Sequence, residues 1–79
     1  MFKPKLEDNE FYFHSDGAHG WLEVPNELIK KLGIEKEITG CSYYHKGKAY
    51  LEEDLDAGFF IVTFRKKTGM EVRLIDKYE

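Results

Sequence analysis

The sequence predicts an α+β fold, a small antiparallel sheet with two helices on one face in the order β-β-α-β-β-α-β. Short aromatic segments separated by turn residues predict the strands. A segment with start and stop signals predicts the first helix over residues 25–34. The length of 79 residues predicts a single domain, 1–79, in which residues 1–9 form a loose N-terminal arm.

The first two strands are expected to pair as a hairpin. Residues 11–14 are short and aromatic, and alternation places Phe11 and Phe13 on one face. Residues 15–20 contain one aspartate and two glycines, which favour a loop. Residues 21–24 then predict the second strand.

The first helix is predicted by its ends as well as by its period. Pro25 suits the first turn and Asn26 is a candidate cap. Leucine and isoleucine at residues 28, 29 and 32 make a narrow apolar stripe. Gly33 is expected to adopt a left-handed conformation, so that Ile34 folds back on the stripe in a Schellman arrangement.

A second hairpin is predicted around Lys46-Gly47, with strands at residues 39–45 and 48–52. Alternation places Tyr43 and Tyr44 on opposite faces, and Tyr50 is expected near the tyrosines of the partner strand.

The residues alone leave segment 57–67 open between helix and strand. Ala57, Phe60, Ile61 and Phe64 have helical spacing, and Gly69 is a candidate terminator. The run of strand formers at residues 59–64 favours a strand instead. A helix would leave Phe59 and Val62 opposite the core stripe, an apolar patch that makes a homodimer an option. Residues 70–76 alternate and predict a final strand.

Composition limits the classes of partner. Lysine and arginine number 12 against 15 acidic residues, a net charge of −3, which disfavours a general nucleic-acid binder. The chain shows neither a signal peptide nor an apolar run long enough to span a membrane, so a cytoplasmic location and no membrane partner are expected. Cys41 is the single cysteine, which excludes an internal disulfide and predicts a reduced, half-buried or buried thiol.

Candidate reaction chemistry is weak, so we expect no enzymatic activity, no cofactor and no metal. His14, Asp16 and His19 lie around one loop, but a zinc site needs a third protein ligand, with His45 or Cys41 as the distant candidates. A solvated turn explains the loop more simply. No phosphate-binding loop, serine elbow or zinc-protease motif is present.

Four motifs resemble a family of small, largely uncharacterised proteins encoded by phages and plasmids. They are HGWLEVP at residues 19–25, LGI at 32–34, SY at 42–43 and YLEEDLDA at 50–57. The resemblance runs from His19 to Phe64 and implies a helix after the acidic residues. The chain departs from the pattern at Leu55, where a cysteine or polar residue is common, and at Val62, where an acid is frequent.

The resemblance also implies a mobile-element setting, in which small proteins often bind and modulate host machinery. We therefore expect a non-enzymatic protein that binds a host protein complex, with inhibition of a defence system as one candidate role. The expected interaction face comprises Trp21, Tyr43, Tyr44, Tyr50, Glu52, Glu53, Asp54 and Asp56.

The alternative is a module that binds single-stranded nucleic acid. The bases of the nucleic acid would stack on the tyrosines, and its phosphates would contact Lys46, Lys48, Arg65, Lys66 and Lys67. For the acids before residue 57, helix capping alone is the structural alternative to a binding role.

Overall fold

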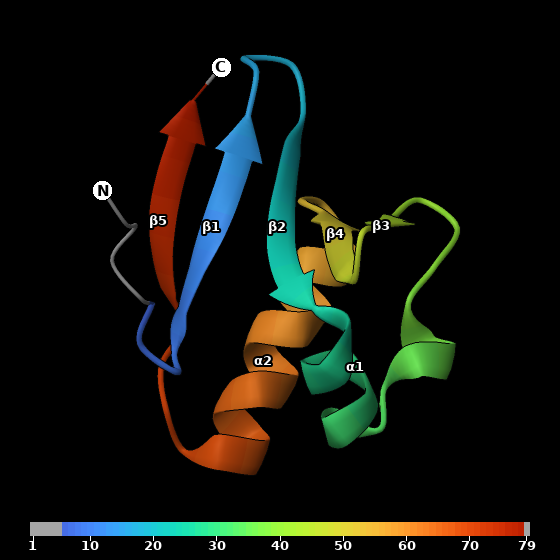
Figure 1. Ribbon diagram of the computed structural model, residues 1–79, viewed down its shortest axis with the longest axis vertical. Helices are drawn as coiled ribbons and strands as arrows, with labels where there is room; N and C mark the ends of the chain where they lie inside the picture. The colour runs from blue at the N-terminus through green and yellow to red at the C-terminus, as the bar shows by residue number, and fades with distance from the viewer. Residues whose placement is uncertain (1–5, 79) are drawn as a thin grey trace.

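In the computed structural model, which describes residues 6–78, five strands form one sheet in the order β3-β4-β2-β1-β5 (Figure 1). The elements along the chain are β1 (Glu10–Ser15), β2 (Gly20–Pro25), α1 (Asn26–Leu32), the 3-10 turn η1 (Glu35–Glu37), β3 (Tyr43–His45), β4 (Lys48–Glu52), α2 (Asp56–Thr68) and β5 (Arg73–Tyr78). The predicted α+β class is confirmed, as is the order of strands and α-helices. No helix within residues 6–78 is both long and apolar enough to cross a membrane.

The core lies between the sheet and the two α-helices, which cover the same face. Every second residue of β1, β2 and β4 points toward the helices, and these residues pack against apolar side chains of α1 and α2. Phe11 of β1 makes edge-to-face contacts with Phe60 and Phe64 of α2, at centroid distances of 5.3 and 5.5 Å. The buried side chains are Phe11, Leu22, Val24, Ile29, Leu32, Ile34, Ala49, Leu51, Ala57, Phe60 and Phe64.

Helix α1 ends as its sequence predicts. Gly33 is left-handed at φ 72°, and its N–H donates to the carbonyl of Lys30. The N–H of Ile34 donates to the carbonyl of Ile29, which completes the Schellman pattern and buries Ile34 against the core. Asn26 is the first helical residue, and no side chain caps this end.

Segment 56–68 is helical because burial outweighs its local strand preference. Phe60 and Phe64 are spaced by one helical turn, so both rings reach Phe11 from a helix. A strand would place residues 60 and 64 on one face too, but it would also turn Val62 into that face. Gly69 ends α2 with φ 77°.

The sheet is mixed, which corrects the prediction that it is entirely antiparallel. Strand β5 pairs with β1 in parallel, with Phe11 opposite Leu74 and His14 opposite Lys77. The other pairs, β1 with β2, β2 with β4 and β3 with β4, are antiparallel. Helix α2 returns the chain to the end of the sheet where β4 began, so β5 runs in the same direction as β4 and β1.

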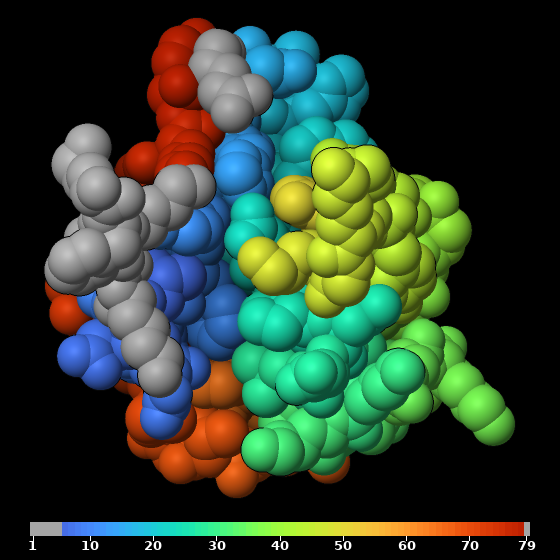
Figure 2. All heavy atoms as spheres, in the orientation of Figure 1, coloured from blue at the N-terminus to red at the C-terminus, as the bar shows by residue number. Residues whose placement is uncertain are grey.

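Strand β3 is shorter than predicted, because residues 39–42 form turns instead of extending it. The N–H of Ser42 donates to the carbonyl of Thr39, and side chains of both residues bind Asp56. The β3–β4 hairpin itself is as predicted, with Lys46 and Gly47 both at positive φ in its turn. Figure 2 shows this hairpin as a yellow-green ridge next to the green atoms of α1, where the N–H of Asn26 donates to the carbonyl of Gly47.

The predicted N-terminal arm lies partly outside the described residues, since the description begins at residue 6. Glu7 and Glu10 close a turn through a backbone hydrogen bond. Asn9 accepts from the N–H of Arg73 and donates its side-chain amide to the carbonyl of Glu71. Residues 7–9 are thus tied to the start of β5.

Candidate functional site

Within residues 6–78, the face of the sheet opposite the two α-helices carries no helix, and we call it the open face. Its residues follow from the strand register, in which His14 lies opposite Trp21, Glu23 opposite Tyr50, and Tyr43 opposite Tyr50. Strand alternation then assigns to the open face Tyr12, His14, Trp21, Glu23, Tyr43, His45, Lys48, Tyr50 and Glu52.

The open face carries a continuous run of ring contacts. Tyr43 stacks on Tyr50 with centroids 4.9 Å apart, and Trp21 meets Tyr43 edge-on at 5.2 Å. His19 stacks on Trp21 at 6.4 Å, which extends the run toward the β1–β2 loop. His14 continues it from Tyr50 to Tyr12 at centroid distances of 5.7 and 6.3 Å. The rings therefore span four strands, β3, β4, β2 and β1.

A charged network lies at the centre of this face. Glu23 accepts hydrogen bonds from His14 Nε2 at 2.8 Å and from Lys48 Nζ at 3.0 Å, one on each carboxylate oxygen. Burial raises the pKa of Glu23, but the hydrogen bonds from His14 and Lys48 outweigh it and leave this pKa below its ordinary value. Glu23 therefore carries its charge at neutral pH, and the side chains of Lys48 and His14 are both hydrogen-bonded to it.

Tyr50 borders the same network and stays protonated. Burial, followed by the negative charge of Glu23, raises the pKa of the Tyr50 phenol above its ordinary value. Its hydroxyl is thus a hydrogen-bond donor and acceptor across the neutral range. A histidine held by a carboxylate can exchange protons, but this network is more simply a polar scaffold for the surrounding rings.

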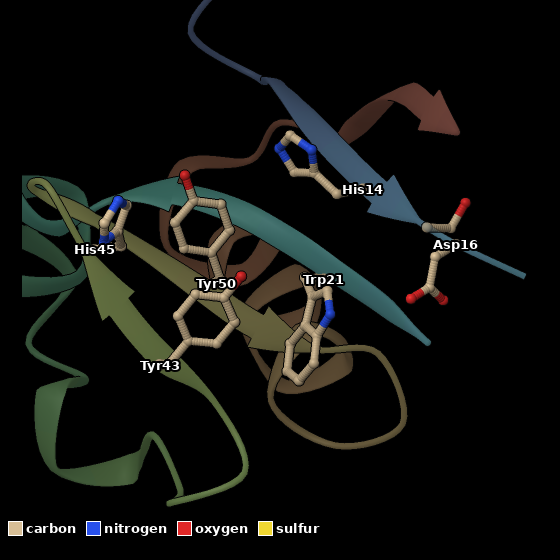
Figure 3. A pocket seen from close by; sticks show the side chains of 7 residues that line it. His14, Asp16, Trp21, Tyr43, His45 and Tyr50 are labelled. Carbon is tan, nitrogen blue, oxygen red and sulfur yellow. The ribbon is translucent and has the colours of Figure 1, made fainter. Parts of the chain in front are cut away.

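A hollow of about 330 Å³ opens between these side chains. Figure 3 shows Tyr43, Tyr50 and Trp21 side by side in it, with His14 and Asp16 coming from β1 and the loop after it. We call it the aromatic hollow, and its lining residues are His14, Ser15, Asp16, Trp21, Tyr43, His45 and Tyr50.

Asp16 is fixed in this lining by its own loop. Its Oδ1 accepts from the backbone N–H of Ala18 at 3.0 Å and of His19 at 2.8 Å. These hydrogen bonds lower the pKa of Asp16 below its ordinary value, and the one from the His19 N–H has the largest effect. The carboxylate is exposed and charged at neutral pH.

Three of the four predicted acids lie where a partner can reach them. Glu52 is opposite Trp21 on the open face, and Glu53 and Asp54 are exposed. The N–H of Glu53 donates to the carbonyl of Gly20, and a Cβ on Gly20 would lie 2.8 Å from the Glu53 carboxylate. This close approach brings the acidic residues next to the β1–β2 loop and its Asp16. One end of the open face is therefore negatively charged.

The prediction that Asp56 belongs to the interaction face is wrong, because Asp56 is only 1% exposed and cannot contact a partner in this fold. Its Oδ2 accepts from the Thr39 N–H at 3.0 Å, from the Thr39 hydroxyl at 2.8 Å and from the Ser42 hydroxyl. The carboxylate thus fastens the turns before β3 to the start of α2. It does not cap α2, whose N-cap residue is Leu55.

Two other predicted positions lie away from the open face. Tyr44 is 51% exposed but sits opposite Ala49, so it belongs to the face on the helix side. Cys41 is exposed in the turns before β3, which corrects the prediction of a half-buried or buried thiol. Among residues 6–78, no group of three or more histidine, cysteine, aspartate or glutamate side chains is placed to hold a metal ion.

The predicted phosphate-binding residues do not form one surface. Arg65, Lys66 and Lys67 occupy the last turn of α2, on the helix side of the sheet, and Arg65 pairs with Glu71 at 3.2 Å. Lys46 is at the tip of the β3–β4 turn. Only Lys48 lies on the open face, where it is paired with Glu23.

Sequence reasoning did not place Tyr12, His14, Asp16 or Glu23 on the interaction face, although it weighed His14 and Asp16 as metal ligands. The available signal was alternation, since Tyr12 and His14 share one face of β1, and Trp21 and Glu23 share one face of β2. What the sequence could not supply was the register that sets these two pairs beside Tyr50.

A second exposed feature is the outer side of α2. As predicted for a helix, Phe59 and Val62 are exposed there, at 39% and 52%, together with Leu55 at 51%. Their spacing places them on one stripe opposite Phe60 and Phe64.

The fold and the site define a small α+β protein with an aromatic open face and an acidic end. Comparison of this chain with family models, with curated proteins and with solved structures gives no match.

Proposed function

We propose that this chain is a non-enzymatic binding protein that docks a basic surface of another protein onto its open face. The observation that carries the proposal is the run of contacting rings, which has the exposed Tyr43 between Trp21 and Tyr50. Tyrosine and tryptophan dominate the energy of protein interfaces because they bury large areas at a small loss of side-chain entropy.

The charges on the open face favour a basic partner. Lys48 and His14 are occupied by Glu23, whereas Asp16, Glu52, Glu53 and Asp54 stay available at one end. Complementary charges speed association and orient the partner. A partner surface rich in arginine and lysine therefore fits this end of the face, with the rings as anchors beside it.

The resemblance to phage and plasmid proteins supports a regulatory role in the same proposal. A small protein of mobile-element origin would act by occluding the basic surface of a host complex, and a defence system is the candidate target. Such surfaces commonly hold nucleic acid, so an acidic face with aromatic anchors would compete for them.

The test is capture with matched surface variants. We expect the wild-type protein to retain one protein partner from a host lysate, and the double variant Trp21→Ser, Tyr43→Ala to lose it. Phe59→Ser is the control, because it removes an exposed ring from the outer side of α2, away from the open face. Circular dichroism should show that all three proteins are folded.

Retention by the double variant, or loss in the Phe59→Ser control, would contradict the proposed face. The partner must also bind through a basic region, so its binding should weaken when salt is raised from about 50 to 500 mM, where the screening length shortens severalfold. Binding that does not respond to salt would remove the electrostatic part of the proposal.

Binding of single-stranded nucleic acid is the second candidate, because stacked rings on a sheet face are a common base-binding platform. Lys77, whose Nζ lies 4.3 Å from the Tyr12 ring centroid, adds one cation to this face. The dispersed basic residues and the acidic end oppose it. A salt-sensitive gel shift with an unstructured oligonucleotide, lost in the same double variant, would favour this candidate over the first.

A further inference from the structure

The aromatic hollow combines ring faces with a fixed carboxylate. Trp21 and Tyr43 meet at an interplanar angle of 71°, so their planes form two walls of a corner. Asp16 lines the same hollow, and its position is set by the backbone N–H groups that hold Oδ1. Among residues 6–78, no hydrogen-bond donor contacts the other oxygen, Oδ2. This lining offers π-electron density and a negative charge to one occupant.

Such a lining selects a cation with N–H groups. The face of an aromatic ring is electron-rich and attracts a cation within about 6 Å of its centroid. The Asp16 carboxylate accepts hydrogen bonds and neutralises the charge. The acids at residues 52–54, at the same end of the open face, add to the negative field.

Arginine fits better than lysine. The guanidinium is planar and weakly hydrated, so it can lie flat on a ring while its edge donates to a carboxylate. The ammonium of lysine is compact and strongly hydrated, and it loses more hydration on entering an aromatic corner. A phosphate group is disfavoured, because Asp16 repels it and Lys48 is already paired with Glu23.

We infer that the aromatic hollow receives an arginine side chain of the partner protein, with the guanidinium against Trp21 and Tyr43 and hydrogen-bonded to Asp16 Oδ2. This inference rests on the proposed binding function and names its anchoring contact. The occupant is a partner arginine exposed on a basic surface.

Trp21 allows a direct test, since it is the only tryptophan in the chain. The probe is the peptide acetyl-Gly-Arg-Gly-amide, and the reporter is the Trp21 indole N–H signal in proton–nitrogen NMR spectra. The matched peptides replace arginine by citrulline, which keeps the shape but is neutral, or by lysine. We expect a saturable shift with the arginine peptide in the millimolar range, about fivefold to tenfold tighter than with citrulline and tighter than with lysine.

The protein variant Asp16→Asn should bind the arginine peptide about fivefold to tenfold more weakly than the wild-type protein does. Asparagine can still accept from the N–H groups of Ala18 and His19, so the loop is expected to keep its conformation. Glu35→Gln on η1 is the control, because it removes one exposed negative charge that does not line the hollow and should leave affinity unchanged.

Equal binding of the citrulline and arginine peptides, no shift of the indole signal, or full affinity in Asp16→Asn would overturn the inference. Tighter binding of guanosine monophosphate than of the arginine peptide, read from the concentration dependence of the shift, would overturn it too. The binding function is judged separately. A partner that Asp16→Asn retains and the Trp21, Tyr43 double variant loses leaves that function standing and removes the arginine contact.

Discussion

At the residue scale, Asp56 shows how position in the fold changes the role of a charged side chain. In the sequence it is one of four neighbouring acids, for which helix capping and a place on the interaction face are the two expectations. In the structure its carboxylate is buried and accepts three hydrogen bonds from Thr39 and Ser42. A buried carboxylate needs such donors, because burial without hydrogen bonds costs several kcal/mol.

Replacing Asp56 by alanine should therefore destabilise the protein by about 2 to 4 kcal/mol, because two hydroxyls and one backbone N–H lose their acceptor. Urea denaturation followed by circular dichroism measures the change. Asp54→Ala is the matched control, since Asp54 is exposed and its removal should change the free energy of unfolding by less than about 0.5 kcal/mol. Equal effects of the two substitutions would show that Asp56 does not hold the turns before β3 to the start of α2.

Glu23 makes stability depend on pH in a defined direction. Its side chain is 14% exposed, and its pKa lies below the ordinary value of 4.5 in the folded state. A carboxyl group with a depressed folded-state pKa stabilises the protein above its unfolded pKa, and this contribution is lost as the pH falls through the folded value.

We expect Glu23→Gln to lower the free energy of unfolding by about 1 kcal/mol at pH 7. The difference from wild type should shrink as the pH is lowered below 4.5, the ordinary glutamate value. Asp16, whose pKa is also lowered, is present in both proteins and cancels in this comparison. Urea titrations at several pH values provide the measurement, and a difference that grows toward acid would contradict the assignment.

At the element scale, one glycine within α2 and one just after it have opposite requirements. Gly58 lies within the helix, and a Cβ there would meet no atom within 4 Å. Gly69 ends the helix at a φ of +77°, where side chains with a Cβ are strained. The same substitution should therefore have opposite signs at the two positions.

Gly58→Ala should stabilise the protein by about 0.5 to 1 kcal/mol, because alanine loses less backbone entropy on entering a helix. Gly69→Ala should destabilise it by about 1 kcal/mol, since the left-handed conformation is unfavourable for an L-residue. Thermal unfolding monitored by far-UV circular dichroism, which reports secondary structure, compares the two variants directly. Shifts of the same sign would exclude this account of the helix end.

At the scale of the whole molecule, burial is concentrated in the middle of the sheet. Strand β2 lies between β1 and β4, and its Leu22 and Val24 are fully buried. Strand β3 is an edge strand of three residues, all of them exposed. Strand β5 lies at the other edge, and its Leu74 is 45% exposed.

Amide hydrogen exchange should reflect this gradient. We expect the amides of β2 to exchange only by global unfolding and those of β3 to exchange by local opening, because few buried contacts hold an edge strand. Exchange rates measured by NMR at increasing urea concentration separate the two regimes. Protection of β3 equal to that of β2 would mean that the hairpin is held more firmly than its exposure indicates.

The sequence by itself determined the local features of this protein. Left-handed glycines, turn residues and alternation act over a few neighbouring residues, so the sequence predicted the C-terminal end of α1, the turns at residues 15–20 and 46–47 and the second strand at residues 21–24. The predicted cap at Asn26 was wrong, because Asn26 is the first helical residue and no side chain caps this end. The exposed stripe on α2 followed from helical spacing once the helix itself was assumed.

Tertiary structure alone decided the rest. Segment 56–68 is a helix because Phe60 and Phe64 pack on Phe11, about fifty residues earlier in the chain, and β5 is parallel because that helix reverses the path of the chain. The burial of Asp56 and the meeting of His14, Glu23 and Tyr50 also depend on partners distant in sequence. Local propensity carries no information about such partners, because their energies arise only when strands take a register and side chains leave water.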